Sequence, residues 1–152
     1  MILEAILAYA HILAILTAVV FVTSETAICR TDWLNPKVVQ RLVTVDRIYL
    51  VGLAAVLITG LARLYFGIKG SAWYWGNWLL HLKLGLFIVV VLLAIRPART
   101  YRRWLRELNA TGALPDAVQV NATRRQAFTA AHIIAVIPLA AAFLARGFGA
   151  IR

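Results

Sequence analysis

The sequence predicts an all-α integral membrane protein, a bundle of four transmembrane helices, on the basis of three observations. Of its 152 residues 62% are hydrophobic and 14% are charged, and the mean hydropathy is +0.82. A chain this apolar is not an ordinary soluble domain. Its apolar residues also form long runs between charged stretches, and these runs lack the polar alternation of barrel strands. We therefore expect a single transmembrane domain over residues 1–152.

Four of the runs are long enough to cross about 30 Å of hydrocarbon at about 1.5 Å per residue. The predicted spans are residues 2–22, 48–67, 78–95 and 127–145.

The second and fourth helices should extend beyond their spans on the cytoplasmic side. Asn35 is a suitable N-cap and Pro36 suits the first helical position, so the second helix should begin there. Its first turns have one apolar face and should lie at the membrane surface. Pro115 should restart the chain as the fourth helix, which Pro138 should bend.

The third helix should kink or end near Pro97, because proline removes a helical hydrogen bond. A basic segment follows, with Trp104, Leu105 and Leu108 as its apolar side. We expect a turn at residues 109–112 and a stop at Gly147.

The distribution of basic residues predicts the orientation. Eleven lie between helices one and two or between helices three and four, against three outside the spans on the other side. The eleven are Arg30, Lys37, Arg41, Arg47, Arg96, Arg99, Arg102, Arg103, Arg106, Arg124 and Arg125. The positive-inside rule predicts that both of these loops are cytoplasmic and that both termini face the outer side of the membrane. Because topology explains the net charge of +10, we expect no nucleic-acid partner.

Other function classes find little support in the sequence. Cys29 is the single cysteine, so a disulfide within the chain and a cysteine metal cluster are excluded, and we expect the thiol to be unreactive. No HExxH, CxxC, GxGxxG, P-loop or nucleophile-elbow pattern occurs. We expect Asp46 and Arg47 to form interfacial ion pairs with Arg41 or Glu25. The aromatic residues Trp73, Tyr74, Trp75 and Trp78 should lie at the opposite interface.

Ionisable groups inside a span are costly and mark candidate sites. His11 and His132 stand in similar contexts, Ala-His-Ile-Leu-Ala and Ala-His-Ile-Ile-Ala. Small residues near each imidazole could admit a flat ring, and neutral imidazole is a natural axial ligand of haem iron. We therefore predict His11 and His132 as metal ligands of one haem b, with His81 as the reserve partner of His11. The alternative is that each histidine hydrogen-bonds between helices.

Cations near the outer span ends could complete such a site. Arg63 and Lys83, helped by Lys69, are predicted to pair with the haem propionates. In the alternative interpretation, Arg63 and Lys83 extend to the outer lipid head groups.

A further set of residues resembles a family of small bacterial membrane proteins of unknown function, over almost the whole chain. These residues are Leu7-Ala8-Tyr9-Ala10-His11, Thr59-Gly60-Leu61-Ala62-Arg63, Gly67, Lys69-Gly70, Tyr74, Asn77, Lys83, Phe87 and Leu114-Pro115-Asp116. More distantly, His11 and Lys83 resemble a histidine and a lysine of the HemJ-type membrane protoporphyrinogen oxidases. That second resemblance implies haem b and a tetrapyrrole substrate.

The leading functional hypothesis is a membrane redox protein that holds haem b and exchanges electrons with a quinone or a porphyrinogen. One alternative is a small permease or proton-coupled carrier, in which His11, His132, Lys83 and Glu25 form a relay. Such a carrier would need a homo-oligomer or partners. A third is a non-catalytic membrane subunit or assembly factor. The lipid bilayer is the partner common to all three.

Overall fold

The computed structural model describes residues 2–67 and 71–148, and this part is a helical bundle without a β-strand. The elements are α1 (Ile2–Ile28), the 3₁₀-helix η1 (Thr31–Trp33), α2 (Pro36–Phe66), α3 (Ser71–Trp75), α4 (Trp78–Thr111) and α5 (Ala117–Ala145). The four longest helices are each long and apolar enough to cross a membrane. The predicted fold class is confirmed.

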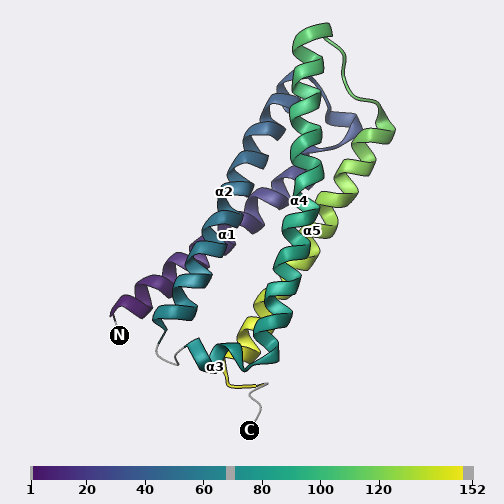
Figure 1. Ribbon diagram of the computed structural model, residues 1–152. Helices are drawn as coiled ribbons and strands as arrows, with labels where there is room; N and C mark the ends of the chain where they lie inside the picture. Colours follow the sequence, from purple (N-terminus) through teal and green to yellow (C-terminus); the bar gives the residue numbers. More distant parts are fainter. Residues whose placement is uncertain (1, 68–70, 149–152) are drawn as a thin grey trace.

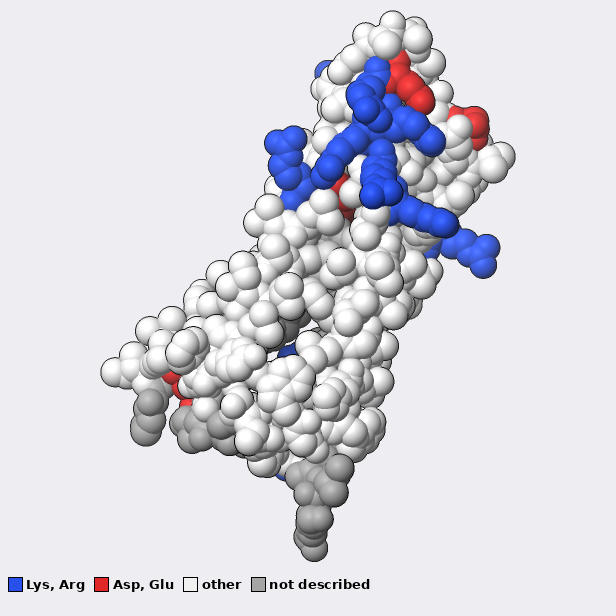
Figure 2. All heavy atoms as spheres, in the orientation of Figure 1, with Lys and Arg blue, Asp and Glu red and all other residues white. Residues whose placement is uncertain are grey.

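The four long helices form two antiparallel pairs. Figure 1 shows α1 lying along α2 and α4 lying along α5, and contacts of α1 with α5 and of α2 with α4 join the pairs. The start of α1 and the end of α5 lie at the same end of the bundle, which we call the terminal end. Figure 2 shows lysine and arginine side chains gathered toward the opposite end, which we call the basic end.

The starts of α2 and α5 follow from side-chain caps. The Asn35 side chain accepts a hydrogen bond from the Val38 amide at 3.0 Å, with Pro36 at the first helical position, as predicted. Asp116 caps α5 by accepting from the Gln119 amide at 2.8 Å. Pro115 therefore precedes the cap, and α5 begins two residues later than its predicted restart.

The third long helix does not end at the proline. α4 continues through Pro97 to Thr111 and ends at Gly112, whose φ of 73° is left-handed and whose amide donates to the Leu108 carbonyl at 2.9 Å. Pro97 is buried in the bundle, and this packing holds the helix together despite one missing hydrogen bond.

The apolar faces at the basic end pack against each other inside the bundle. Val39, Leu42 and Val43 of α2 form one buried cluster with Tyr101 and Trp104 of α4 and with Cys29 and Val120. Burial between helices stabilises these side chains just as contact with lipid could, and sequence hydropathy does not distinguish the two. The bundle therefore extends as a packed unit beyond the predicted spans.

The predicted aromatic belt is divided between the core and the surface. Trp73 and Tyr74 of α3 pack against buried leucines at the terminal end. Trp75 and Trp78 are 45% and 56% exposed. The short helix α3, which was not predicted from the sequence, carries Trp73, Tyr74 and Trp75. At the predicted stop of the fourth helix, Gly147 lies just beyond the end of α5 with a φ of 84°.

Replacing Gly52 with alanine is expected to destabilise the α1–α2 pair. An added Cβ would lie 3.2 Å from the backbone nitrogen of Ala18 and 3.3 Å from its Cα, so the helices would have to separate. We expect a loss of about 1–3 kcal/mol in the free energy of unfolding, measured by SDS-induced unfolding with circular dichroism. Gly85→Ala is the matched control, because its Cβ would meet nothing within 4 Å. An equal loss in both variants would contradict the close contact.

Candidate functional site

A cavity lies between the helices in the half of the bundle near the terminal end. Its volume is about 90 Å³, and residues from α1, α2, α3, α4 and α5 line it. The walls are mostly apolar, and His11 and Lys83 are the ionisable residues among them. Figure 2 shows a hollow in this half of the surface with basic atoms inside it.

His11 is held in one orientation by Thr59. The imidazole is 3% exposed, and its Nδ1 lies 2.8 Å from the Thr59 hydroxyl oxygen. The Thr59 hydroxyl donates its hydrogen to the Ala55 carbonyl at 2.6 Å, so it accepts from the Nδ1–H of His11. The other ring nitrogen, Nε2, then carries a lone pair. It is buried and has no hydrogen-bond partner in the described part of the chain.

Gly60 makes room for the His11 ring. A Cβ at this position would lie 3.2 Å from Cε1 of His11. Thr59 and Gly60 are thus consecutive α2 residues that fix the imidazole by a hydrogen bond and by a close approach. Neither residue was predicted to belong to the site, although Thr-Gly is an unusual pair of a polar and a small residue within an apolar span.

Lys83 brings a positive charge to the same cavity from α4. Its side chain is partly buried, and no hydrogen bond or ion pair links it to another described residue. The charges of Lys83 and Arg63 both act on the His11 ring. Arg63, near the end of α2, is partly exposed and does not line the cavity. Lys69 lies outside the described residues.

The two other histidines are exposed and do not line the cavity. His81 Nε2 lies 3.0 Å from the Trp75 carbonyl oxygen. His132 Nδ1 lies 2.8 Å from the carbonyl oxygen of Phe128, one turn earlier on α5, and its ring packs on the Phe128 ring at 4.2 Å. Each ring thus has a neighbour of its own, and the structure does not bring either of them to His11.

The position of each histidine around its helix axis explains why His11 is buried and His132 is exposed. On α1, His11 is in register with the buried Ala14, Ala18 and Val22. On α5 the buried positions are Ala127, Ala130, Ile134 and Ile137. A residue two positions before Ile134 faces the opposite side of a helix with 3.6 residues per turn. Similar local sequences therefore lie on opposite faces.

A family profile described as "Predicted membrane protein (DUF2214)" matches residues 3–149. The chain belongs to this family. The match agrees with the resemblance to small membrane proteins of unknown function. No curated protein and no solved structure matches the chain. The resemblance to HemJ-type oxidases stays a prediction.

This DUF2214 chain has a second set of buried polar groups toward the basic end. Glu25 and Asp46 are each 1% exposed. One Glu25 oxygen, both Asp46 oxygens and the hydroxyls of Tyr49 and Tyr101 have no hydrogen-bond partner among the described residues. The charge of Asp46 acts on Glu25, and that of Arg102 acts on Asp46. The prediction of interfacial ion pairs for Asp46 is therefore wrong, because the side chain turns into the bundle.

An apolar layer separates the two polar regions. Glu25 follows His11 by fourteen positions on the same face of α1, about 21 Å along the axis. Between them the core consists of apolar side chains that include Ala18, Val22 and Leu53. The His11–Lys83 cavity is therefore a site at one end of the bundle and does not continue to Glu25 through polar groups.

Proposed function

We propose that this membrane protein binds a monocyclic quinone in the cavity between His11 and Lys83. The observation that carries the proposal is the buried Nε2 of His11, a hydrogen-bond acceptor in an otherwise apolar cavity that Lys83 also lines. Among the residues that the structure describes, this Nε2 has no hydrogen-bond partner and Lys83 has no acidic partner. Apolar walls with a few polar groups are typical of sites for lipid-soluble ligands.

The size of the cavity favours a small ring. An apolar cavity of about 150 Å³ binds benzene in an engineered protein, and the cavity here is about 90 Å³. A single ring therefore needs only a modest shift of the lining side chains. A porphyrin needs a far larger slot.

The two polar groups match the chemistry of a quinone in both redox states. The Lys83 ammonium donates hydrogen bonds only, so it suits a carbonyl oxygen of the oxidised ring. The Nε2 of His11 accepts, so it suits a hydroxyl of the reduced ring. A quinone that bridges them gains one contact in each state, and an isoprenoid tail can pass between the helices into the lipid.

Haem b and electron transfer stay predictions from the sequence. His11 retains one feature of an axial ligand, since its Nδ1–H is held by an oxygen while Nε2 is free. The cavity as it stands does not fit a macrocycle, and His132 and His81 lie outside it. A Soret band from protein purified from haem-replete cells, weakened by His11→Ala, would support haem; a colourless preparation would count against it.

The carrier alternative has less support. A proton relay from His11 to Glu25 needs polar groups or water between them, whereas the intervening core is apolar. No observation on the described residues favours the subunit or assembly-factor alternative over quinone binding.

Replacing Lys83 with methionine is expected to weaken quinone binding at least about tenfold, the loss expected for one charge-assisted hydrogen bond. The measurement is the quenching of tryptophan fluorescence when decylubiquinone is added to purified protein in detergent, because Trp75 lines the cavity. His11→Leu should weaken binding of the reduced form more than that of the oxidised form.

His132→Leu is the matched control, since it removes an exposed imidazole from another face. Its affinity should stay within about twofold of the unmodified protein. Quenching that does not saturate, or that is the same in all variants, would overturn the proposal.

The orientation belongs to the same proposal. The excess of arginine and lysine at the basic end supports a cytoplasmic location for that end, in a bacterial inner membrane, with both termini periplasmic. The quinone site then lies in the periplasmic half. A reporter fused to the C-terminus should be active in the periplasm. A reporter that is active in the cytoplasm would reverse the proposed orientation of the protein in the membrane.

A further inference from the structure

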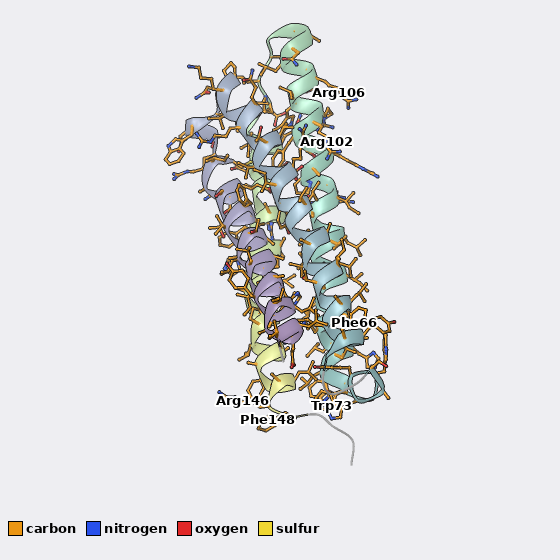
Figure 3. The ribbon with its side chains drawn as sticks, turned by 90° about the vertical axis from the view of Figure 1, so that its left-hand side faces the viewer. Phe66, Trp73, Arg102, Arg106, Arg146 and Phe148 are labelled. Carbon is orange, nitrogen blue, oxygen red and sulfur yellow. The ribbon has the colours of Figure 1, made fainter. Side chains whose placement is uncertain are left out.

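Arginine side chains from two helices converge on a surface groove at the basic end. The groove has a volume of about 610 Å³ and is lined by Arg47 of α2 and by Arg99, Arg102, Arg103 and Arg106 of α4. Figure 2 shows a dense group of basic side chains at this end, and Figure 3 shows Arg102 and Arg106 on the same side of α4.

A second hollow adjoins the groove. Its volume is about 310 Å³, it shares Arg99 and Arg103 with the groove, and it adds Arg96. All six arginines are exposed. The adjoining hollows thus offer two neighbouring places for an anion.

The positive charges in the groove are poorly compensated within the described residues. Among the described residues, Arg103 is the one of these arginines that forms an ion pair, with Glu107 at 3.7 Å, where both side chains are about half exposed. Arg103 also donates a hydrogen bond to the Gln119 side-chain oxygen at 3.1 Å. Arg102 acts on the buried Asp46 without an ion pair. Like charges held close together repel, so an anion in the groove should stabilise this end of the bundle. The planar guanidinium group binds phosphate through two hydrogen bonds.

The groove lies where hydropathy places a lipid head group. Arg47 immediately precedes the predicted span 48–67, Arg96 immediately follows the predicted span 78–95, and Arg99 lies three residues beyond Arg96. Two apolar residues, Val43 and Leu105, also line the groove. A ligand there meets guanidinium groups and apolar side chains together, which matches a phospholipid better than a free anion.

We propose that the groove and the adjoining hollow bind the head group of an anionic phospholipid with two phosphates. The positive-inside rule alone requires basic residues at this end but not their convergence. Lys37, Arg41 and Arg125 are also exposed basic residues, and they lie outside both hollows. They provide a control of equal charge.

The test uses the purified full-length protein after removal of bound lipid. Native mass spectrometry and thermal unfolding are measured with added cardiolipin, which carries two phosphates, and with phosphatidylcholine. The groove variant combines Arg99→Gln, Arg102→Gln and Arg106→Gln. The control variant combines Lys37→Gln, Arg41→Gln and Arg125→Gln, which removes the same charge.

We expect cardiolipin to raise the unfolding temperature of the unmodified protein and phosphatidylcholine to leave it unchanged. The groove variant should bind cardiolipin at least about tenfold more weakly than the control variant. Equal weakening in both variants would show attraction by overall charge and would overturn the proposal. Displacement of cardiolipin by millimolar inorganic phosphate would also overturn it, because the ligand would then be a free anion.

Discussion

Replacing Trp104 with alanine is expected to lower the free energy of unfolding by about 3–5 kcal/mol, because it leaves a large cavity in a packed core. Trp104 is fully buried at the basic end, where it packs with Leu42 and Val120. Its ring lies 5.6 Å from that of Tyr101, and its indole N–H donates to the Gln119 side chain at 3.1 Å. SDS-induced unfolding measures the loss.

Two further tryptophan substitutions separate packing from other effects. Trp104→Phe keeps most of the ring and loses the hydrogen bond to Gln119, so we expect a smaller loss of about 0.5–1.5 kcal/mol. Trp33→Ala removes a tryptophan at the same end that is 53% exposed. The Cζ atom of Arg30 lies 5.0 Å from the centroid of the Trp33 ring. Its cost should be below about 1 kcal/mol. A Trp104→Ala loss no larger than that of Trp33→Ala would mean that the basic end is not a packed core.

The transmembrane helices could be predicted because the bilayer leaves the backbone few choices. A long apolar run must satisfy its amides internally, so the four runs predicted four helices. The N-cap at Asn35 could also be predicted from the sequence, because it depends on a local hydrogen bond from the Val38 amide to the Asn35 side chain. Pro97 was misleading, since the interruption of one bond did not outweigh the packing of the residues around it.

Side-chain direction was the part that sequence could not settle. Trp104 and Leu42 were assigned to apolar faces, yet an apolar face can meet lipid or another helix, and only the arrangement of α2 and α4 decides. The same limit applies to the site. His11 and Lys83 were singled out as costly residues and lie at one cavity. His132 was singled out for the same reason and faces outward.

Polar residues near the span ends were the least predictable. Glu25 and Asp46 flank apolar runs, where carboxylates are normally exposed, and both are buried. The spacing of His11, Ala14, Ala18, Val22 and Glu25 along α1 carried a signal, because these positions share one face. The sequence does not show which face of α1 is buried, and His11 alone does not identify it. This spacing therefore could not predict that Glu25 is buried.

Cys29 is expected to resist alkylation in the folded protein by at least about a hundredfold relative to an exposed cysteine. The side chain is 0% exposed. Burial raises the pKa of the Cys29 thiol to about 11 from an ordinary value of 9.0, and the Glu25 carboxylate adds to the increase while Tyr101 and Arg124 oppose it. Because the thiolate is the nucleophile, two pKa units reduce the reactive fraction about a hundredfold at pH 8. N-ethylmaleimide labelling followed by mass spectrometry measures the rate.

An exposed cysteine at the same end gives the reference rate. Thr31→Cys in a Cys29→Ala background places a thiol at an exposed position two residues away. It should react fast, and Cys29 should match it only after unfolding in SDS. The raised pKa also predicts that Cys29 lowers stability as pH rises from about 9 to 11, because the folded state retains the thiol proton more strongly than the unfolded state. Cys29→Ala should remove that part of the pH dependence.

The two predictions test the same cluster, since Cys29 and Trp104 belong to it. If the cluster holds the basic end together, Trp104→Ala should accelerate Cys29 labelling, whereas Trp33→Ala should not. Rapid labelling in the unmodified folded protein would mean that the thiol is accessible and that the helices do not pack there. Slow labelling in every variant would instead show that the region around Cys29 stays closed without Trp104, and the predicted loss of stability would then be too large.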